Sequence, residues 1–527
     1  MVQSYKKKHQ LESLYDVIII GSGIGSLTAG VFLAKAGKKV LILERHYTAG
    51  GYTHIFKRRG YEWDVGIHYI GEVGRPNSIL RRLFDYISDS KLEWADMGEV
   101  YDRIVVGDKT YDFVKGANNF KARLIEYFPN EADAIKAYVD LVFKTVKTSR
   151  NYFLEKAMPP LVAKLSGGIM RGPFLKMASK TTREVLEGLT QNEELITVLT
   201  GQYGDYGLAP AESSFAMHAS VARHYFAGGY FPIGGSSRIV ETVADVLEKH
   251  KSTILVSAEV DELILEGKTA VGVRMKDGKT FHAPTIISGA GIMTTYKTLL
   301  PEGGLNTFKL EQQLQKVKAS AAHICLYVGL NGDPDELKLP KANYWIYPKE
   351  GTHESNIQRY LDDIDQPFPV VYVSFPSAKD PDWSNRYPGR STIDIISIMP
   401  YELFEQWEGT AWKKRGESYE ALKEKMAQRL LETLFEQEPH LRDAIDCYEL
   451  STPITTKHFV NYANGEIYGL DHDPSRFQHK FLRPHTPIKN LYLTGQDIVT
   501  AGIGGALFAG VITASAITRK NMIRDIF

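Results

Sequence analysis

The sequence predicts an α/β protein whose core is a parallel sheet assembled from separate stretches of the chain. Near each end, a short apolar run stops at a glycine-rich turn that opens a helix. The first run is 15–20 before Gly21, and the second is 490–494 before Gly495. The composition agrees, since 527 residues with 43% hydrophobic and 24% charged content are ordinary for a globular chain of two or more domains.

The N-terminal turn belongs to a strand–turn–helix–strand unit. Residues 15–20 form the β-branched strand, and 27–36 have the spacing of a helix. Residues 39–43 form a second strand, which ends at Glu44. This order is that of a Rossmann-like dinucleotide-binding unit, with an acid about 20 residues after the turn.

The residues of the turn match the chemistry of a bound pyrophosphate, which prefers the free N–H groups of a helix N-terminus. Gly21 allows the tight turn, and Gly23 lets the backbone approach the phosphates. Ser26 stands where the fingerprint has Gly or Ala, so we expect looser packing there. Glu44 would accept hydrogen bonds from a ribose hydroxyl and repel a 2′-phosphate. The alternative is a plain βαβ unit whose glycines serve packing alone.

Two further glycine clusters favour FAD over a nicotinamide cofactor. Gly50 and Gly51 lie just past the second strand, where an extended FAD needs another close backbone approach; alone they would also fit a surface turn. At the other end, Gly495 and Asp497 precede 502–506, after which small residues continue as a helix to about 517. The uncharged stretches 17–34 and 498–518 are long enough to cross a bilayer, but their glycines favour two halves of one cofactor site.

Charge and cysteine content exclude several classes of protein. Lys+Arg and Asp+Glu are both 63, so the basic footprint of a nucleic-acid binder is absent. The two cysteines, Cys325 and Cys447, argue against a disulfide framework, and no metal-binding motif occurs. The basic N-terminal stretch 1–14 lacks the apolar core of a secretory signal. We therefore expect a cytoplasmic protein, with peripheral membrane contact as an open alternative.

The cofactor domain is expected to be discontinuous, using residues 1–75, 228–300 and 485–527. The middle piece contains short strands and a hairpin turn at Asp277-Gly278. The substrate domain would consist of 76–227 and 301–484. Within it, 158–183 interleaves apolar residues with Lys and Arg, which fits a membrane-facing helix or a cap over a substrate channel equally well.

Several motifs together carry a family resemblance. The two ends resemble the flavin amine-oxidase and phytoene-desaturase superfamily. Interior stretches are similar to retinol saturases and carotenoid isomerases: 62–71 (EWDVGIHYIG), 224–236 (HYFAGGYFPIGGS), 451–453 (STP) and 465–470 (GEIYGL). The resemblance extends over most of the chain. It implies an α/β fold with a Rossmann-like FAD domain of glutathione-reductase type and an α+β substrate domain.

The resemblance also implies which residues hold FAD. The first turn and the stretch after Glu44 would bind the ADP part, Val260 would approach the adenine, and Gly289 and the C-terminal glycines would follow the flavin. The candidates are Gly21, Gly23, Ile24, Gly25, Ser26, Glu44, Arg45, Gly50, Gly51, Tyr52, Val260, Gly289, Gly495, Asp497, Gly504, Gly505 and Ala506.

The implied activity is chemistry on a carbon–carbon double bond of a long apolar polyene or isoprenoid lipid, with saturation favoured. His68 and Tyr69 are the candidate catalytic residues, since their motif lies near the flavin in this superfamily. The alternative is a structural histidine beside a tyrosine of the channel wall. His218 and Tyr230 are candidates for substrate contact. No second complete dinucleotide fingerprint occurs, so electrons are expected from a separate, unidentified donor.

Three other functions stay open at this stage. A desaturase or a cis–trans isomerase of the same fold would use the same site. A flavin-containing protein without catalytic activity would keep the cofactor residues alone. An amine oxidase is a further alternative, because many of these bind flavin non-covalently.

Overall fold

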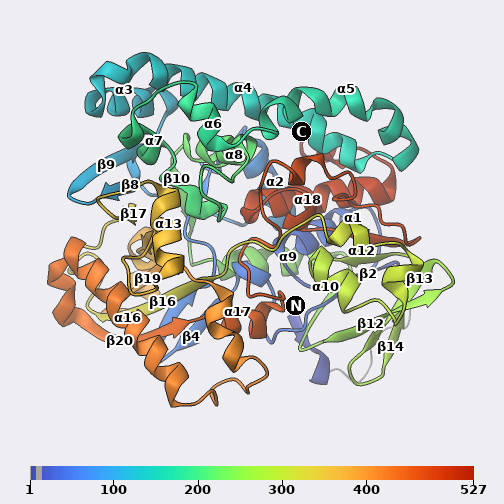
Figure 1. Cartoon of the computed structure of the whole chain (residues 1–527). Helices are drawn as coiled ribbons and strands as arrows, with labels where there is room; N and C mark the ends of the chain where they lie inside the picture. The colour runs from blue at the N-terminus through green and yellow to red at the C-terminus, as the bar shows by residue number, and fades with distance from the viewer. Residues whose placement is uncertain (1, 8–14) are drawn as a thin grey trace.

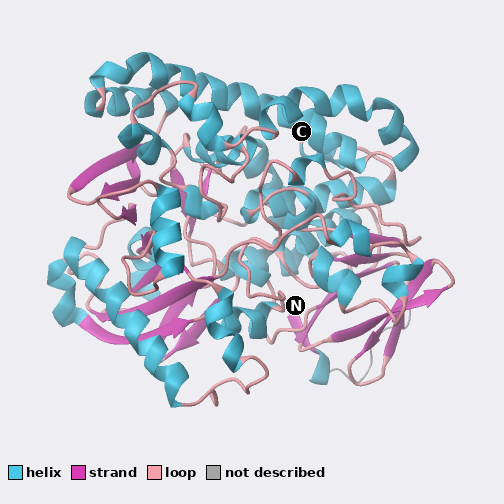
Figure 2. Ribbon diagram, in the orientation of Figure 1, coloured by secondary structure: helices cyan, strands magenta, loops and turns pink. Residues whose placement is uncertain are grey.

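A computed structural model describes residues 2–7 and 15–527 of the chain. Most of the basic N-terminal stretch, including Lys8, lies outside the described residues. Figure 1 shows a layer of helices along one side, with two separate groups of strands beneath it. Figure 2, coloured by secondary structure, shows that helices and loops fill the space between the two strand groups.

One group of strands is a six-stranded sheet in which every neighbouring pair is parallel. Its strands come from the two ends and the middle of the chain, as the sequence predicts. Every residue of the three central strands β3, β2 and β15 is buried, as expected for a sheet covered on both faces. In spatial order they are β1 (Val2–Ser4), β11 (Thr253–Val256), β3 (Val40–Leu43), β2 (Val17–Ile20), β15 (Ile286–Ser288) and β21 (Leu491–Leu493).

Two helices from opposite ends of the chain pack directly against each other at this sheet. They are α1 (Ile24–Lys35) and α18 (Gly502–Thr518), and both are buried over most of their length. A Cβ built on Gly510 would lie 2.5 Å from Gly25 O and 2.8 Å from Ala29 N. The helices therefore approach backbone to backbone. On the same side of the sheet lie α9 (Ser237–Lys249) and α2 (Ile79–Ser88), which share a hydrophobic core with α1 and α18.

A three-stranded antiparallel meander follows in the middle segment. The turn at Lys276-Asp277-Gly278 joins two of its strands, with Gly278 at a φ of 86°. This confirms the predicted hairpin. Its strands are β12 (Val260–Glu266), β13 (Thr269–Met275) and β14 (Thr280–His282).

The second large sheet has seven strands, and all neighbouring pairs are antiparallel except β17 with β8. Its order is β20 (Ile445–Ser451), β16 (His323–Asn331), β19 (Arg390–Ile398), β18 (Val371–Ser374), β17 (Asn343–Tyr347), β8 (Val100–Val106) and β9 (Lys109–Val114). Two small sheets lie beside it. One pairs β4 (Ile55–Arg58) with β5 (Tyr61–Asp64), and the other has the order β6 (Ile70–Gly71), β10 (Gly229–Pro232), β7 (Trp94–Asp96).

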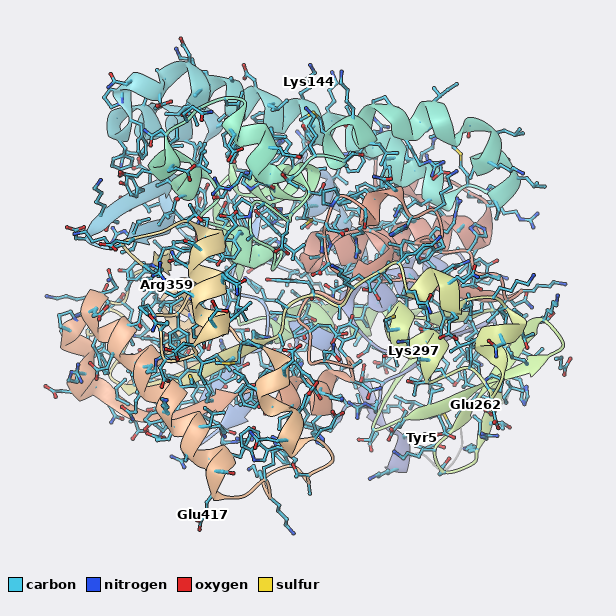
Figure 3. The ribbon with its side chains drawn as sticks, in the orientation of Figure 1. Tyr5, Lys144, Glu262, Lys297, Arg359 and Glu417 are labelled. Atoms are coloured by element: carbon cyan, nitrogen blue, oxygen red, sulfur yellow. The ribbon has the colours of Figure 1, made fainter. Side chains whose placement is uncertain are left out.

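The helical layer at the top of Figure 1 is dominated by two long helices, α4 (Ala132–Ala157) and α5 (Pro160–Ala178). In Figure 3 the Lys144 side chain points outward from this layer. The layer also contains α3 (Ala117–Tyr127), α6 (Thr182–Glu187), α7 (Glu193–Leu199) and α8 (Phe215–Tyr225). The other α-helices are α10 (Ile292–Lys297), α11 (Gly304–Thr307), α12 (Glu311–Leu314), α13 (His353–Asp362), α14 (Pro376–Lys379), α15 (Trp383–Arg386), α16 (Glu417–Gln437) and α17 (Pro453–Val460).

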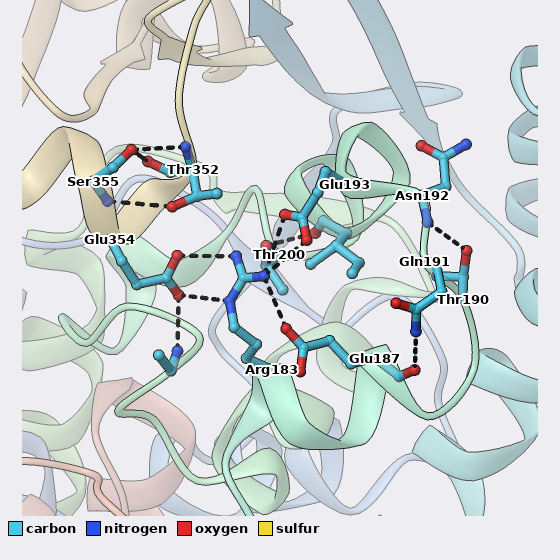
Figure 4. A network of polar contacts seen from close by, with 12 residues as sticks. Arg183, Glu187, Thr190, Gln191, Asn192, Glu193, Thr200, Thr352, Glu354 and Ser355 are labelled. Atoms are coloured by element: carbon cyan, nitrogen blue, oxygen red, sulfur yellow. Dashed lines mark hydrogen bonds and ion pairs between the residues drawn. The ribbon is translucent and has the colours of Figure 1, made fainter.

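Arg183 ties this layer to a distant part of the chain. Its guanidinium donates to both carboxylate oxygens of Glu354 on α13, at 3.2 and 2.9 Å, and also pairs with Glu187 and Glu193 (Figure 4). A bidentate arginine–carboxylate pair is among the stronger polar contacts available to a protein. Arg183 therefore joins two pieces of the predicted substrate domain.

The long apolar stretches that the sequence offers are used inside the fold. In the part of the chain that the structure describes, no helix has the length and hydropathy needed to cross a membrane. The stretch 17–34 supplies β2 and α1, and 498–518 supplies α18. The boundaries predicted at 75, 228, 300 and 485 stay a prediction, although the parallel sheet draws its strands from all three proposed cofactor segments.

We predict opposite effects on stability for two glycine substitutions in helices, one at the contact between α1 and α18 and one on the exposed face of α5. Gly510→Ala should destabilise the protein by about 1–3 kcal/mol, because its Cβ would meet backbone atoms that have no room to move. Gly168→Ala, on the exposed face of α5 with nothing within 4 Å of the new Cβ, should instead stabilise by about 0.5–1 kcal/mol. Thermal denaturation midpoints of the two variants test this. Equal midpoints would contradict the close approach.

Candidate functional site

A single large cavity runs between the two helix N-termini and the seven-stranded sheet. Its volume is about 1090 Å³. This exceeds the roughly 300–1,000 Å³ typical of a pocket for one drug-sized ligand. Every residue predicted to bind FAD lines it, and so do both predicted catalytic residues: Gly21, Gly23, Ile24, Gly25, Ser26, Glu44, Arg45, Gly50, Gly51, Tyr52, His68, Tyr69, Val260, Gly289, Gly495, Asp497, Gly504, Gly505 and Ala506.

Two helices begin at the cavity with free backbone donors. The N-cap of α1 is Gly23 and that of α18 is Ala501, and neither helix has a side-chain cap or an acidic residue in its first turn. The first N–H groups of a helix have no partner within the helix, and they attract anions. A Cβ built on Gly23 would have nothing within 4 Å, so open space faces the turn. These features fit an extended dinucleotide with its pyrophosphate at α1.

The glycine turns also touch one another. A Cβ on Gly25 would lie 2.8 Å from Ala506 O and 2.9 Å from Gly495 Cα. The unusual Ser26 is accommodated from the far side, because a Cβ on Gly289 would lie only 2.0 Å from Ser26 Oγ. The absence of a side chain at Gly289 thus makes room for Ser26, and the expected loosening of the turn is not seen.

Glu44 is held at the end of β3 by three hydrogen bonds. Its carboxylate accepts from Ser22 N at 2.8 Å, from Ser22 Oγ at 2.6 Å and from His46 N at 2.7 Å. Ser22 Oγ in turn accepts from Gly50 N at 2.9 Å. One acid therefore fixes the first turn and, through Ser22, the Gly50–Gly51 pair. Its contact with a ribose stays a prediction.

Asp497 is buried at the flavin end of the predicted site. Its carboxylate accepts from Ile292 N at 2.7 Å and from Leu470 N at 3.2 Å. Burial raises the pKa of Asp497, and the nearby Arg476 opposes that rise. Arg476 also donates to the carbonyl oxygens of Gln496 and Asp497, at 2.8 and 2.9 Å. The loop before α18 is thereby locked in place.

The other half of the cavity is aromatic. Tyr69 and Tyr225 stack with ring centroids 4.1 Å apart and an interplanar angle of 8°. Trp345 and Tyr372, on neighbouring strands of the seven-stranded sheet, have centroids 4.5 Å apart. These rings and Tyr468 all line the cavity. One of these pairs is stacked and the other is tilted by 52°, and together they give the cavity an aromatic wall that suits a long conjugated apolar molecule.

The cavity reaches the surface near the C-terminus. Two of its lining residues, Ile79 at the start of α2 and Phe527, are 40% and 69% exposed. Residues of α4, among them Phe153 and Leu154, line the same region. In Figure 1 the C-terminus lies directly below α4 and α5. The cavity thus opens to the surface beside the helical layer.

His68 and Tyr69 face the cavity in different electrostatic settings. Burial, together with the nearby Lys379, lowers the pKa of His68 to about 3. His68 Nδ1 lies 3.5 Å from Asp394 Oδ2, and it has no hydrogen-bond partner. Tyr69 OH donates to Asp102 Oδ2 at 2.8 Å. His68 is therefore a neutral side chain, whereas Tyr69 belongs to a hydrogen-bonded network of acids.

The two predicted substrate residues lie behind the cavity wall. His218 is 3% exposed, and its ring nitrogens bond Tyr138 OH at 2.8 Å and Tyr206 OH at 3.1 Å. Tyr230 packs against Gly74, and its hydroxyl donates to Ala227 O. Neither is among the lining residues, so the geometry does not support a direct substrate contact for His218 or Tyr230.

Sequence reasoning missed several polar residues at the aromatic end. Asp205 lines the cavity, and Asp102, Gln202 and Lys379 are buried close behind it. The segment 201–207, Gly-Gln-Tyr-Gly-Asp-Tyr-Gly, offered a signal, because loops carry many binding and catalytic residues and its glycines indicate a loop around Asp205. Lys379 gave none, since its position follows from the packing of α14 against the sheet.

Comparisons with known proteins identify the family to which this chain belongs. A family model described as an NAD(P)-binding Rossmann-like domain matches residues 19–87. Over 97% of the chain, the sequence is 36% identical to all-trans-retinol 13,14-reductase of Danio rerio, covering 87% of that protein. It is 35% identical to the Homo sapiens all-trans-retinol 13,14-reductase, over 98% of the chain and 88% of that protein. The chain belongs to the all-trans-retinol 13,14-reductase family.

Two further relatives have names that indicate other functions. The prolycopene isomerase of Arabidopsis thaliana is 27% identical over 98% of the chain and 85% of that protein. A Danio rerio protein named an inactive all-trans-retinol 13,14-reductase is 33% identical over the whole chain and 89% of that protein. The resemblance predicted from the motifs is thus confirmed. The family contains both reductases and a member named as inactive.

Solved structures support the fold. An oxidoreductase from Methanosarcina mazei superposes with a TM-score of 0.62 at 16% identity, covering 96% of this chain and 100% of that one. The cyclohexylamine oxidase from Brevibacterium oxydans gives 0.60 at 16% identity, covering 96% and 99%. At such identities the likeness concerns the fold alone. The predicted Rossmann-like α/β architecture is confirmed.

From the burial of His68 we predict the pH range in which its ring stays neutral. With a pKa of about 3, the ring should stay neutral from pH 8 down to pH 5, because protonation would place a charge in an apolar wall beside Lys379. NMR of protein with isotope-labelled histidine, compared with a His68→Gln variant to assign the resonance, measures this. A His68 midpoint near 6.5 would contradict the burial, and the urea-unfolded protein supplies the reference titration.

Proposed function

We propose that this protein is an FAD-dependent reductase that saturates one carbon–carbon double bond of a long, apolar polyene such as all-trans-retinol. The observation that carries the proposal is the single cavity, in which a dinucleotide cradle continues directly into an aromatic tunnel. Its volume leaves room for a substrate beside a cofactor. Membership of the retinol reductase family supports the same substrate class.

The residues present would divide the work as follows. The glycine turns at Gly21–Ser26 and Gly50–Gly51 would bind the ADP part, and Asp497 with Gly504–Ala506 would bind the ribityl chain and ring. A bound, reduced flavin supplies a hydride, so the protein supplies orientation and dryness. Tyr69, Trp345 and Tyr372 would hold the polyene flat against that ring. His68 would be a neutral wall residue and not a charged acid.

The same site would suit an isomerase or a desaturase, and the family likeness to prolycopene isomerase keeps these as second candidates. A non-catalytic flavin protein is a third candidate, because one relative is named as inactive. The polar residues behind Tyr69 favour catalysis, since a passive cofactor site would have no need of them.

Product mass separates these candidates. Purified protein, kept reduced without oxygen by a chemical donor, should convert all-trans-retinol to a product heavier by two hydrogens. A desaturase, assayed with its flavin oxidised, would give loss of two hydrogens, and an isomerase would give no mass change. Glu44→Arg is the matched control: it should lose FAD, because the new cation removes the acceptor that orders Ser22 and Gly50, and with it all turnover. Intact FAD with no conversion of retinol or other polyenes would contradict the proposal.

We also propose that the exposed face of α5 rests on an anionic membrane from which the substrate enters. Leu161, Leu165 and Ile169 lie along this face and are 78%, 88% and 86% exposed. Lys164 and Lys176 are exposed on the same helix, so the face combines apolar residues with positive charge. Helices that lie in a membrane surface have this combination.

Vesicle binding tests this surface. The double variant Leu165→Gln with Ile169→Gln should bind phosphatidylserine-containing vesicles at least about tenfold more weakly, since each buried aliphatic side chain contributes about 1.5–3 kcal/mol. Reduction of retinol dissolved in detergent should be unchanged. Leu361→Gln, which removes a 50% exposed leucine from α13, is the control and should bind like the original protein. Equal binding by all three proteins would contradict the proposal.

A further inference from the structure

Two aspartates share the hydroxyl of Tyr69. The hydroxyl donates to Asp102 Oδ2 at 2.8 Å and lies 3.5 Å from Asp205 Oδ2. Gln202 Nε2 also donates to Asp102 Oδ2, at 2.7 Å, and lies 3.4 Å from the Tyr69 hydroxyl. The side chains thus form a continuous path from β8, through Tyr69, to the turn that contains Asp205.

At least one of the two aspartates keeps its proton at a pH at which an exposed aspartic acid is ionised. Burial raises the pKa of Asp102 to about 7. Burial, and then the charge of Asp102, raises the pKa of Asp205 well above its ordinary value. Two carboxylates this close in a low dielectric do not both ionise, as in the paired acids of other active sites. The pair around Tyr69 therefore holds a proton at neutral pH.

The surrounding charges distinguish the two acids. Lys379 lies behind Asp102: its ammonium hydrogen-bonds Asn343, whose Nδ2 donates to Asp102 Oδ1 at 2.9 Å. The hydrogen bonds from Asn343, Tyr69 and Gln202, and then the charge of Lys379, lower the pKa of Asp102 and partly offset its burial. For Asp205, Tyr69 is the only side-chain hydrogen-bond partner seen among the described residues. The proton is therefore held more firmly on Asp205 than on Asp102.

Only the Asp205 end of the path opens into the cavity. Asp205 and Tyr69 line it, whereas Asp102 is fully buried and does not. The turn that contains Asp205 is linked to the predicted flavin end through Tyr468. Tyr468 OH donates to Gly204 O at 2.9 Å, and two residues further on Leu470 N donates to Asp497. A short stretch of backbone thus connects the acid to the loop expected to hold the ribityl chain.

We propose that Asp205 is a catalytic residue that gives a proton to the substrate, that the Tyr69 hydroxyl passes the replacement proton, and that Asp102 is the reservoir behind it. The inference rests on the proposed reduction and adds the second half of its chemistry. It assigns to Tyr69 a relay role and removes His68 from acid catalysis.

The step balances as follows. A bound, reduced flavin would supply a hydride, with its electron pair, to one carbon of the double bond and would thereby be oxidised. The π bond breaks, and its electrons form a C–H bond at the second carbon with the proton of Asp205, whose O–H bond breaks. Asp205 is left as a carboxylate and takes the Tyr69 hydroxyl proton, and Tyr69 takes one from the protonated form of Asp102. After product release, water in the emptied cavity gives a proton to Asp205, Tyr69 passes a proton back to the buried Asp102, and a second proton from water restores Asp205. An external two-electron donor would reduce the flavin again.

The first test is a single turnover. Flavin is reduced beforehand, oxygen is excluded, all-trans-retinol is added, and the return of oxidised flavin absorbance is followed. Asp205→Asn should slow this by about 10²–10⁴-fold while retinol binding is unchanged, as expected for loss of a general acid. Tyr69→Phe should allow one turnover at a smaller cost but slow later turnovers, since the relay is broken.

Asp471→Asn is the matched control. Burial also raises the pKa of this aspartate to about 7, yet it lies outside the cavity wall. It should react at the original rate. An Asp205→Asn protein that reacts as fast as Asp471→Asn would overturn the inference while leaving the proposed reduction intact. An unsubstituted protein whose reduced flavin never reacts with a polyene would instead overturn the proposed reduction itself.

A second readout does not depend on turnover. Infrared spectra of the cofactor-free protein at pH 8 report protonated carboxyl groups by their carbonyl stretch. The difference between the original protein and Asp205→Asn should contain one such band, shifted in D2O, and Tyr69→Phe should move its frequency. If no band is lost in Asp205→Asn, the carboxyl is already ionised and the inference is wrong.

Discussion

The structure depends on one close contact, the approach of α1 and α18 backbone to backbone. Gly25, Gly495 and Gly510 make this approach, because a Cβ at Gly25 or Gly510 would overlap a neighbouring backbone. The contact brings the turns after β2 and β21 together at the carboxyl ends of these parallel strands. Two uncapped helix N-termini consequently face one cavity. The cofactor cradle is thus a product of helix packing, and its polar groups are mostly backbone.

The second half of the site follows from burial. The seven-stranded sheet gives the cavity an aromatic wall, and the same low dielectric acts on every ionisable group placed there. Burial lowers the pKa of His68, so its ring is neutral, and raises the pKa values of Asp102 and Asp205, so the pair holds a proton at neutral pH. The aromatic tunnel and the proposed proton reserve therefore both result from the same exclusion of water. The glycine-rich turn at 201–207 connects them.

The sequence could predict the cofactor half because its signals are local. A glycine turn between a strand and a helix, with Glu44 at the right distance, identifies its own neighbours, and all of these residues line the cavity. The sequence could not predict the proton path, because its residues come from four segments that are separated along the chain. These residues are Asp102, Tyr69, Asp205 and Lys379. His218 illustrates the converse: it stands near a family motif, but the helix turns its ring toward Tyr138 and Tyr206. Sites made of backbone groups can be predicted from a local sequence pattern. Networks of side chains cannot, because they depend on how distant segments pack together.

The central claim is that one cavity holds cofactor and polyene in line, with the acid at their junction. A crystal structure of the protein with FAD and all-trans-retinol, reduced without oxygen, tests this most directly. The account predicts the pyrophosphate at Gly21–Ser26, the flavin ring beside Gly504, and the polyene against Tyr69 and Tyr372 with its reacting double bond between the ring and Asp205. A polyene bound outside this cavity, or a flavin ring turned away from Tyr69 and Asp205, would contradict it.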